Sequence, residues 1–251
     1  MKLMVLDGNS LVNRAFYGVG KNQLLTTRQG LHTNAIYGFV TMLQKLLDQE
    51  KPDAVCAAFD RREPTFRHKA DAAYKANRKG MPEELAEQML PLKQVLDAMS
   101  VPCYELSGYE ADDLIGTISR KCEAAGWDCV VVTGDKDSLQ LITDHTKVKL
   151  VSTRMGQTTT KDMTPETFRE QYGFAPIHMI DLKALMGDSS DNIPGVAGIG
   201  EKTASALVKE YGTIEELYAK YEDSTLTKGV KTKLANGADS AKAVSYTHLR
   251  A

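Results

Sequence analysis

The chain has 251 residues, of which 42% are hydrophobic, and its 31 Lys and Arg nearly balance its 33 Asp and Glu. This composition supports a folded core and excludes a disordered chain, while the near-zero net charge by itself indicates no particular partner. The four cysteines are too widely spaced for a CxxC motif, no apolar run approaches the roughly 18 residues of a membrane span, and the N-terminus enters a strand without a signal peptide, so we expect a cytoplasmic protein with buried thiols.

Strands and helices alternate at the start of the chain. The apolar run from Lys2 to Leu6 predicts a buried strand, followed by a helix that Asn9 or Ser10 could cap. Apolar residues at helical spacing predict a second helix from Thr33 to Gln49, and the segment from Asp53 to Phe59 predicts a second strand.

The alternation continues through the middle of the chain. An amphipathic helix is predicted from Pro82 to Met99, with Pro91 kinking it or breaking it into two. Further strands are predicted at Val101 to Leu106, Asp128 to Thr133 and Lys147 to Ser152. Strands separated by helices form parallel βαβ units, so the predicted fold class is α/β with a mostly parallel central sheet flanked by helices.

The last third of the chain is predicted to be helical. Thr164 could cap a helix with Pro165 in its first position, and a further helix is predicted from Ile177 to Met186. A polar loop from Gly187 to Gly195 follows. It leads into a glycine-rich turn and an Ala-rich helix that begins near Glu201.

Carboxylates gather where the predicted strands end. Three strands run into Asp7, Asp60 and Asp135, and the carboxyl ends of parallel strands share one edge of a sheet, so we expect these side chains to converge. Within the stretch from Tyr109 to Leu141, five carboxylates lie at the start of one predicted helix and the end of the next strand, a crowding that is costly unless a cation lies among them: Glu110, Asp112, Asp113, Asp135 and Asp137. The alternative for any single one is that Asp is common in turns.

The segment from Arg61 to Lys79, here called the basic segment, has a different character. It holds seven Lys and Arg against two acidic residues, with Phe66 and Tyr74 among them. Cationic and aromatic side chains together are typical of single-strand binding, although most charge runs are only solvated helix faces. We interpret the basic segment as a phosphate-binding element.

The glycine hairpin from Gly195 to Gly200 joins two predicted helices and is followed by Lys202 and Thr203. Glycines at such a turn let backbone N–H groups and a helix N-terminus approach a phosphate oxygen. Contacts of that kind hold DNA without reading its sequence. A simple helix-to-helix turn is the alternative.

These motifs together resemble the 5′ nuclease domains at the N-terminus of bacterial DNA polymerases I, in the flap endonuclease superfamily. The resemblance covers nearly the whole chain, to about Ser245. The motifs that carry it are Leu6-Asp7-Gly8-Asn9-Ser10, Ala58-Phe59-Asp60, Tyr74-Lys75-Ala76-Asn77-Arg78, Glu110-Ala111-Asp112-Asp113, Thr133-Gly134-Asp135-Lys136-Asp137, Gly187-Asp188-Ser189-Ser190-Asp191-Asn192-Ile193-Pro194-Gly195 and the glycine hairpin.

The resemblance implies a role for each group of residues. Lys75 and Arg78 are expected to face the scissile phosphate from a helical arch. The expected metal-binding residues are Asp7, Asp60, Glu110, Asp112, Asp113, Asp135, Asp137, Asp188 and Asp191. The expected substrate-binding residues are Arg67, Tyr74, Lys79, Gly195, Gly198, Gly200, Lys202 and Thr203. Reduced paralogues lack the Asp188 and Asp191 pair, so its presence favours an active enzyme.

The same resemblance implies a domain plan and partners. We expect an α/β nuclease core at 1–175 with the arch at about 61–100, a helix-hairpin-helix subdomain at 176–245, and a foreign or truncated tail at 246–251. The expected partner is DNA with a 5′ end or 5′ flap, bound by a monomer without sequence specificity. The parent protein could carry a polymerase domain, and we expect it in the bacterial cytoplasm at the nucleoid.

Hard oxygen ligands without a histidine cluster suit Mg²⁺, with Mn²⁺ as a substitute and two or more ions bound. The family often holds K⁺ at the hairpin. Two alternatives stay open: a DNA-junction binding module whose catalytic site has decayed, and a phosphatase with a strand-end Asp nucleophile, for which Asp7-Gly8-Asn9 lacks the second Asp. The balance between exonuclease and flap endonuclease activity also stays open.

Overall fold

The structure, a computed structural model, describes residues 1–18, 25–78, 80–154 and 157–247. The chain forms two compact units. The first comprises Met1–Glu63 and Gly80–Thr164, and the second comprises Pro64–Lys79 and Pro165–Arg250. Most of the basic segment therefore belongs to the second unit, with the helices near the end of the chain.

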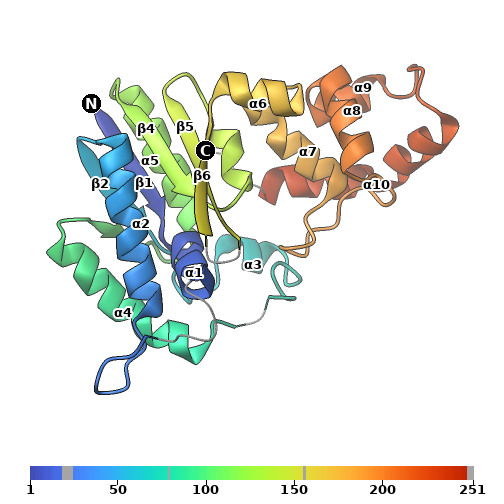
Figure 1. The fold of residues 1–251 in the computed structure, drawn as a ribbon. Coiled ribbons are helices and arrows are strands. Elements are labelled where there is room, and N and C mark those ends of the chain that lie inside the picture. Colours follow the sequence, from blue (N-terminus) through green and yellow to red (C-terminus); the bar gives the residue numbers. More distant parts are fainter. Residues whose placement is uncertain (19–24, 79, 155–156, 248–251) are drawn as a thin grey trace. The chain divides into compact units, whose positions relative to one another are not determined.

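The first unit contains a six-stranded sheet in the order β3-β2-β1-β4-β5-β6 (Figure 1). All neighbouring strands are parallel except β6, which runs antiparallel to β5. This confirms the predicted, mostly parallel sheet. The strands are β1 (Lys2–Asp7), β2 (Ala54–Ala58), β3 (Cys103–Tyr104), β4 (Asp128–Thr133), β5 (Thr146–Arg154) and β6 (Gln157–Met163).

Helices cover both faces of this sheet because its central strands are apolar on both sides. Met4 and Leu6 belong to a buried cluster with the helices that connect the first strands, whereas Val5 points to the opposite face, on the side of the helix before β4. The helices of this unit are α1 (Gly8–Gly18), α2 (Asn34–Glu50), α4 (Glu83–Ala98) and α5 (Ala111–Ala124), with the 3-10 helix η1 (Asp137–Leu141).

Three predicted details of this unit were wrong. Asn9 and Ser10 do not cap α1, because the helix begins at Gly8 and the Asp7 carboxylate accepts the Ser10 N–H at 3.0 Å. Of the kink or break predicted at Pro91, the break is absent, because α4 runs through Pro91 and buried leucines on either side of it hold both halves against the core. The third strand is only two residues long.

The strand β6 was not predicted, and its sequence explains why. Six of its seven residues are exposed, and they are Thr, Gln, Lys and Asp rather than an alternation of apolar and polar side chains. It is held at the edge of the sheet by its ladder with β5. A strand stabilised chiefly by a partner leaves little signal in its own residues.

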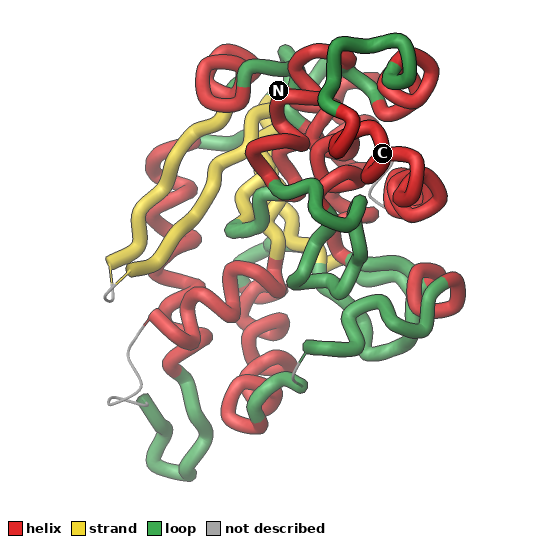
Figure 2. Tube along the Cα trace, turned by 90° about the vertical axis from the view of Figure 1, so that its right-hand side faces the viewer, coloured by secondary structure: helices red, strands yellow, loops and turns green. Residues whose placement is uncertain are grey.

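In the second unit, the described residues form helices and loops only (Figure 2). The helix that begins at Pro165 confirms the predicted start after Thr164. The helix predicted from Ile177 to Met186 is a short 3-10 turn, η2 (Pro176–His178), that continues as α7 (Met179–Met186). The other helices are α3 (Phe66–Ala70), α6 (Pro165–Tyr172), α8 (Glu201–Tyr211), α9 (Ile214–Lys220) and α10 (Lys228–Thr247).

The long helices of this unit pack around α7, which contacts α8, α9 and α10. Leu185, Leu207 and Leu234 are buried in this helical core. The helix α10 includes Tyr246 and Thr247, whereas residues 248–251 of the expected foreign tail lie outside the described residues.

Two further expectations concern the cysteines and the membrane. All four cysteines are free, and Cys56, Cys122 and Cys129 are buried while Cys103 is half-buried, which confirms the expected buried thiols for three of them. No helix within the described residues is both long and apolar enough to cross a membrane.

Candidate active site

The sheet brings three of the predicted carboxylates to adjacent strand ends. The strand β1 lies between β2 and β4, and its last residue, Asp7, pairs with Ala58 of β2. Asp60 follows β2 and Asp135 follows β4 within two residues of each strand end. The charges of Asp60 and Asp135 both act on Asp7, so the three carboxylates share one electrostatic environment, as predicted from the strand pattern.

Asp7 is the most deeply placed of these carboxylates, with 5% of its surface exposed. Its two oxygens accept hydrogen bonds from the Ser10 N–H at 3.0 Å and the Thr133 hydroxyl at 2.5 Å. The pKa of Asp7 is nevertheless raised from 3.8 to about 6, chiefly by burial and in part by the charges of Asp60 and Asp135, and the two hydrogen bonds oppose this rise only partly. Any cation that approaches such a carboxylate stabilises its ionised form.

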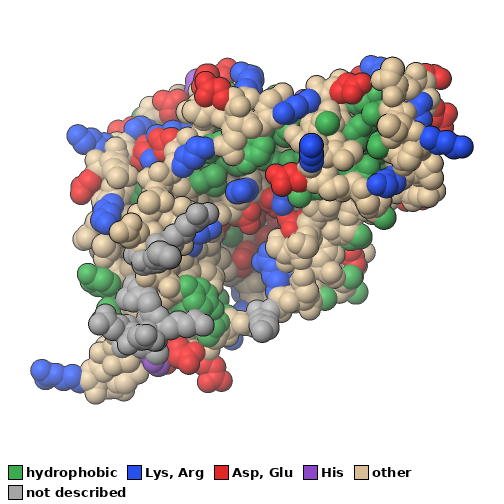
Figure 3. Space-filling view, turned by 45° about the vertical axis from the view of Figure 1, so that its right-hand side comes forward, with side chains coloured by type: hydrophobic (Ala, Val, Ile, Leu, Met, Phe, Trp, Pro, Cys, Tyr) green, Lys and Arg blue, Asp and Glu red, His purple; other side chains and the backbone are tan. Residues whose placement is uncertain are grey.

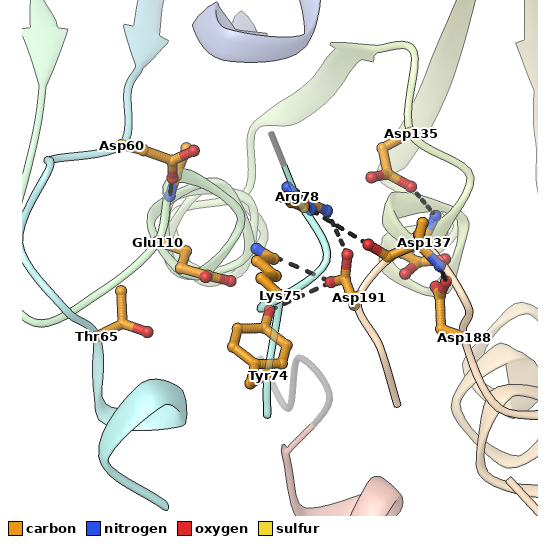
Figure 4. A network of polar contacts seen from close by, with 12 residues as sticks. Asp60, Thr65, Tyr74, Lys75, Arg78, Glu110, Asp135, Asp137, Asp188 and Asp191 are labelled. Carbon is orange, nitrogen blue, oxygen red and sulfur yellow. Dashed lines mark hydrogen bonds and ion pairs between the residues drawn. The ribbon is translucent and has the colours of Figure 1, made fainter. Parts of the chain in front are cut away.

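Asp60 connects the end of β2 to the start of α5. Its Oδ1 accepts the Ala111 N–H at 2.7 Å, and its own N–H donates to Asn9 Oδ1 at 3.1 Å. Glu110 and Asp113 form a reciprocal capping box at this helix start, and Glu110 is buried. Figure 4 shows Asp60 and Glu110 beside this helix. The predicted acidic cluster at 110–113 therefore begins α5, where the helix dipole favours negative charge.

The turn after β4 holds Asp135 and Asp137 together. The Asp137 N–H donates to Asp135 Oδ1 at 2.9 Å, and the Asp135 N–H donates to the Thr133 hydroxyl at 2.9 Å. Arg14 of α1 donates to the Gly134 carbonyl at 2.6 Å. No role was predicted from the sequence for Thr133 or Arg14, because each acts through a contact with a residue more than a hundred positions away in the chain.

The described carboxylates do not form a complete metal-coordination site. No three His, Cys, Asp or Glu side chains in the described ranges are close enough to hold one metal ion together. Some of these carboxylates are engaged by backbone N–H groups instead, as Asp60 is by Ala111. The donor chemistry still fits a hard divalent cation, since every candidate ligand is a carboxylate oxygen and Asp7 is buried among like charges.

The other two predicted metal ligands, Asp188 and Asp191, lie in the second unit, in the loop from Gly187 to Asn192, here called the acidic loop. Lys183 donates to Asp188 at 2.6 Å, and the Ser190 N–H and hydroxyl donate to the same carboxylate. Although burial favours the protonated form, these donors hold the pKa of Asp188 well below its ordinary value.

Asp191 is held by the residues predicted to face the scissile phosphate. Arg78 pairs with its Oδ1, Lys75 Nζ lies 3.9 Å from its Oδ2, and the Tyr74 hydroxyl donates to the same oxygen at 3.3 Å (Figure 4). In this structure Lys75 and Arg78 therefore neutralise a carboxylate of their own unit.

Arg67, another predicted substrate-binding residue of the basic segment, differs from what an exposed basic face requires. Arg67 is buried, with its guanidinium carbon 4.5 Å from the centre of the Phe66 ring. Lys79 lies outside the described residues. On the face shown in Figure 3, Lys and Arg side chains are dispersed among acidic ones and do not gather in one patch.

The glycine hairpin leads into the N-terminus of α8. Gly200 precedes the helix in an extended conformation, and a Cβ at this position would meet no atom within 4 Å. Packing therefore does not require a glycine here, which fits a position kept open for another molecule. Lys202 is exposed and Thr203 half-buried in the first turn, while Gly195 lies tightly against the backbone of Gly187.

Comparisons with known proteins agree with this architecture. The family model of the 5′-3′ exonuclease N-terminal resolvase-like domain matches residues 2–173, and that of the 5′-3′ exonuclease C-terminal SAM fold matches residues 174–248. Among solved structures, T5 5′-exonuclease with bound zinc has a TM-score of 0.76 at 23% identity, covering 99% of this chain and 88% of that one. The catalytic core of Rad2 in complex with DNA has a TM-score of 0.58 at 17% identity, covering 99% and 80%.

Curated relatives point to the same family. DNA polymerase I of Bacillus subtilis is 47% identical over 240 residues, which are 96% of this chain and 27% of the relative. DNA polymerase I of Streptococcus pneumoniae is 42% identical over 241 residues, again 96% and 27%. The chain thus spans about a quarter of the length of these relatives. It belongs to the 5′-3′ exonuclease family, with both the N-terminal resolvase-like domain and the C-terminal SAM fold of that family.

Proposed function

We propose that this chain is a structure-specific 5′ nuclease that hydrolyses DNA phosphodiesters at 5′ ends and 5′ flaps with the help of divalent metal ions, in primer removal and DNA repair. The observation that carries the proposal is the buried Asp7 carboxylate, which shares its electrostatic environment with Asp60 and Asp135 at adjacent strand ends. Family membership and the metal ions and DNA named for the structural neighbours support the same chemistry.

The proposed metal ligands are the nine carboxylates predicted from the sequence, with Mg²⁺ as the resident ion and Mn²⁺ as a substitute. Two ions bound together would supply a hydroxide nucleophile and stabilise the leaving 3′ oxygen. The chain's own residues would provide the rest: Asp7 and Asp135 hold the cation, and Lys75 and Arg78 offset charge on the phosphoryl oxygens. The glycine hairpin and the N-terminus of α8 would bind the duplex backbone without reading sequence.

Several finer proposals follow from the same family. The protein would act as a monomer, in the bacterial cytoplasm at the nucleoid, as part of a longer chain with a polymerase domain. A K⁺ ion could assist the hairpin. Within the hairpin, the Gly198 carbonyl accepts a hydrogen bond from the Lys233 ammonium at 3.0 Å.

Cleavage of a labelled 5′-flap DNA tests the proposal. We expect products in Mg²⁺, none after chelation, and a rate loss on the order of 100-fold or more for Asp112→Asn and Asp135→Asn. Asp48→Asn, a change of an exposed carboxylate on α2, is the matched control and should cleave like the wild type. Unchanged cleavage in the two site variants would refute the metal-site assignment. Flap binding without turnover in Mg²⁺ would instead support a decayed binding module.

A further inference from the structure

One stretch of the basic segment, the turn at 71–78, is bound to the acidic loop through backbone and amide groups. The Lys75 N–H donates to the Asp191 carbonyl at 2.8 Å, and Asn192 Nδ2 donates to the Ala73 carbonyl at 2.7 Å. Asn77 Nδ2 donates to the Ser189 carbonyl at 2.8 Å. Since both stretches belong to the second unit, these contacts define a docked arrangement within one compact body.

The backbone at the contact is in a conformation that needs support from its surroundings. Lys75 and Asn192 have positive φ angles of 55° and 57°. A non-glycine residue in this left-handed region costs roughly 1–2 kcal/mol and persists where neighbouring contacts hold it. The mutual hydrogen bonds of the turn and the acidic loop provide that support, so we expect the two conformations to depend on each other.

Charge adds to this docking at a single carboxylate. The Asp191 side chain is 13% exposed and meets both Lys75 and Arg78. The Lys75 ammonium also lies 4.9 Å from the centre of the Tyr74 ring, and the Tyr74 hydroxyl donates to Asp191. The three side chains that the family pattern assigns to the substrate thus all contact one proposed metal ligand.

We propose that Asp191 is a shared partner, for which the cations of the turn and a divalent metal ion compete. In the docked state Lys75 and Arg78 neutralise Asp191. Binding of a metal ion to Asp191 displaces them and frees both side chains for the phosphate, so the docked turn is an autoinhibitory contact that metal loading releases. The inference rests on the proposed metal-dependent nuclease function.

The second carboxylate of the acidic loop provides an internal contrast. Asp188 pairs with Lys183 of α7, a cation that belongs to the helical core and has no part in the turn. Of the two carboxylates, Asp191 is the one that pairs directly with Lys75 and Arg78, so competition there couples the metal to the position of both cations.

Hydrogen exchange of the full chain, without DNA, tests the proposal by a readout other than activity. Saturating Mg²⁺ should speed exchange at the amides of the turn several-fold, the Lys75 N–H above all, while peptides of β4 stay unchanged. In Asp191→Asn and Lys75→Met, exchange of the turn should be fast already and insensitive to Mg²⁺. Lys69→Met removes an exposed cation from α3 and should behave like the wild type.

The second measurement is a Mn²⁺ titration, in which electron paramagnetic resonance of the ion monitors its binding. The Lys75→Met variant should bind Mn²⁺ about threefold to fivefold more tightly than the Lys69→Met variant. This factor corresponds to the free energy that a partly exposed ion pair contributes. Slow exchange of the turn in saturating Mg²⁺, or equal Mn²⁺ affinities in the two variants, would overturn the proposal. If the same preparation cleaves flap DNA, only the inference fails; if it neither cleaves DNA nor binds Mn²⁺, the proposed function fails with it.

Discussion

Replacement of Asp7 by Asn should stabilise the metal-free protein while it removes cleavage. Burial raises the pKa of this carboxyl from 3.8 to about 6, so the folded state holds the proton more tightly than the unfolded state. The contribution of protonated Asp7 to the free energy of unfolding is therefore fully present below pH 3.8 and is lost as the pH rises through 6. At pH 7 the ionised Asp7 therefore costs up to about 3 kcal/mol, and Asp7→Asn should recover about 1–3 kcal/mol of it.

Urea unfolding with a chelator present measures this effect. The gain of Asp7→Asn over the wild type should be largest at pH 7.5 and should shrink at pH 5, where the folded wild type carries the proton. Asp48→Asn, on the exposed side of α2, controls for the loss of a charge and should show neither effect. A variant that is less stable than the wild type at pH 7.5, or a gain that does not vary with pH, would refute the reasoning.

Three other predictions concern separate parts of the chain. Glu50→Gln should destabilise the first unit by about 3 kcal/mol in urea unfolding, because the buried Glu50 accepts from Lys149 and Lys147; its lowered pKa means that this stability is present above pH 4.5 and is lost as the pH falls further. Gly200→Ala should leave the unfolding midpoint unchanged, since a Cβ there meets open space, and should weaken flap binding in a fluorescence anisotropy assay roughly threefold to tenfold, the worth of one hydrogen bond. Lys75→Ala should lower the single-turnover cleavage rate on the order of 100-fold with little change in duplex affinity, and equal losses in both would mean that Lys75 only anchors DNA.

The sequence predicted the strand-end carboxylates well because their signals are local. An apolar run that ends on Asp7, and again before Asp60 and Asp135, fixes both the strand and the position of the acid at its end. The parallel order of the sheet then brings the three together, and β1 does lie between β2 and β4.

Contacts between distant segments could not be predicted in the same way. The hydrogen bond from Arg14 to Gly134 and the pairing of the basic segment with Asp191 join residues more than a hundred positions apart. Nothing in the spacing of Lys75 or Arg78 distinguishes a cation that faces phosphate from one that pairs with a carboxylate of its own unit. Only the folded structure makes that distinction.

We propose above all that the strand-end carboxylates Asp7 and Asp135 bind a divalent metal ion on which DNA cleavage depends. Anomalous diffraction from crystals of the full chain soaked in Mn²⁺ tests it most directly, because it locates the ion without reference to activity. We predict a peak in coordination contact with the Asp7 and Asp135 carboxylates, absent in Asp135→Asn. A map in which Mn²⁺ binds elsewhere and leaves these strand-end aspartates without metal would contradict the claim.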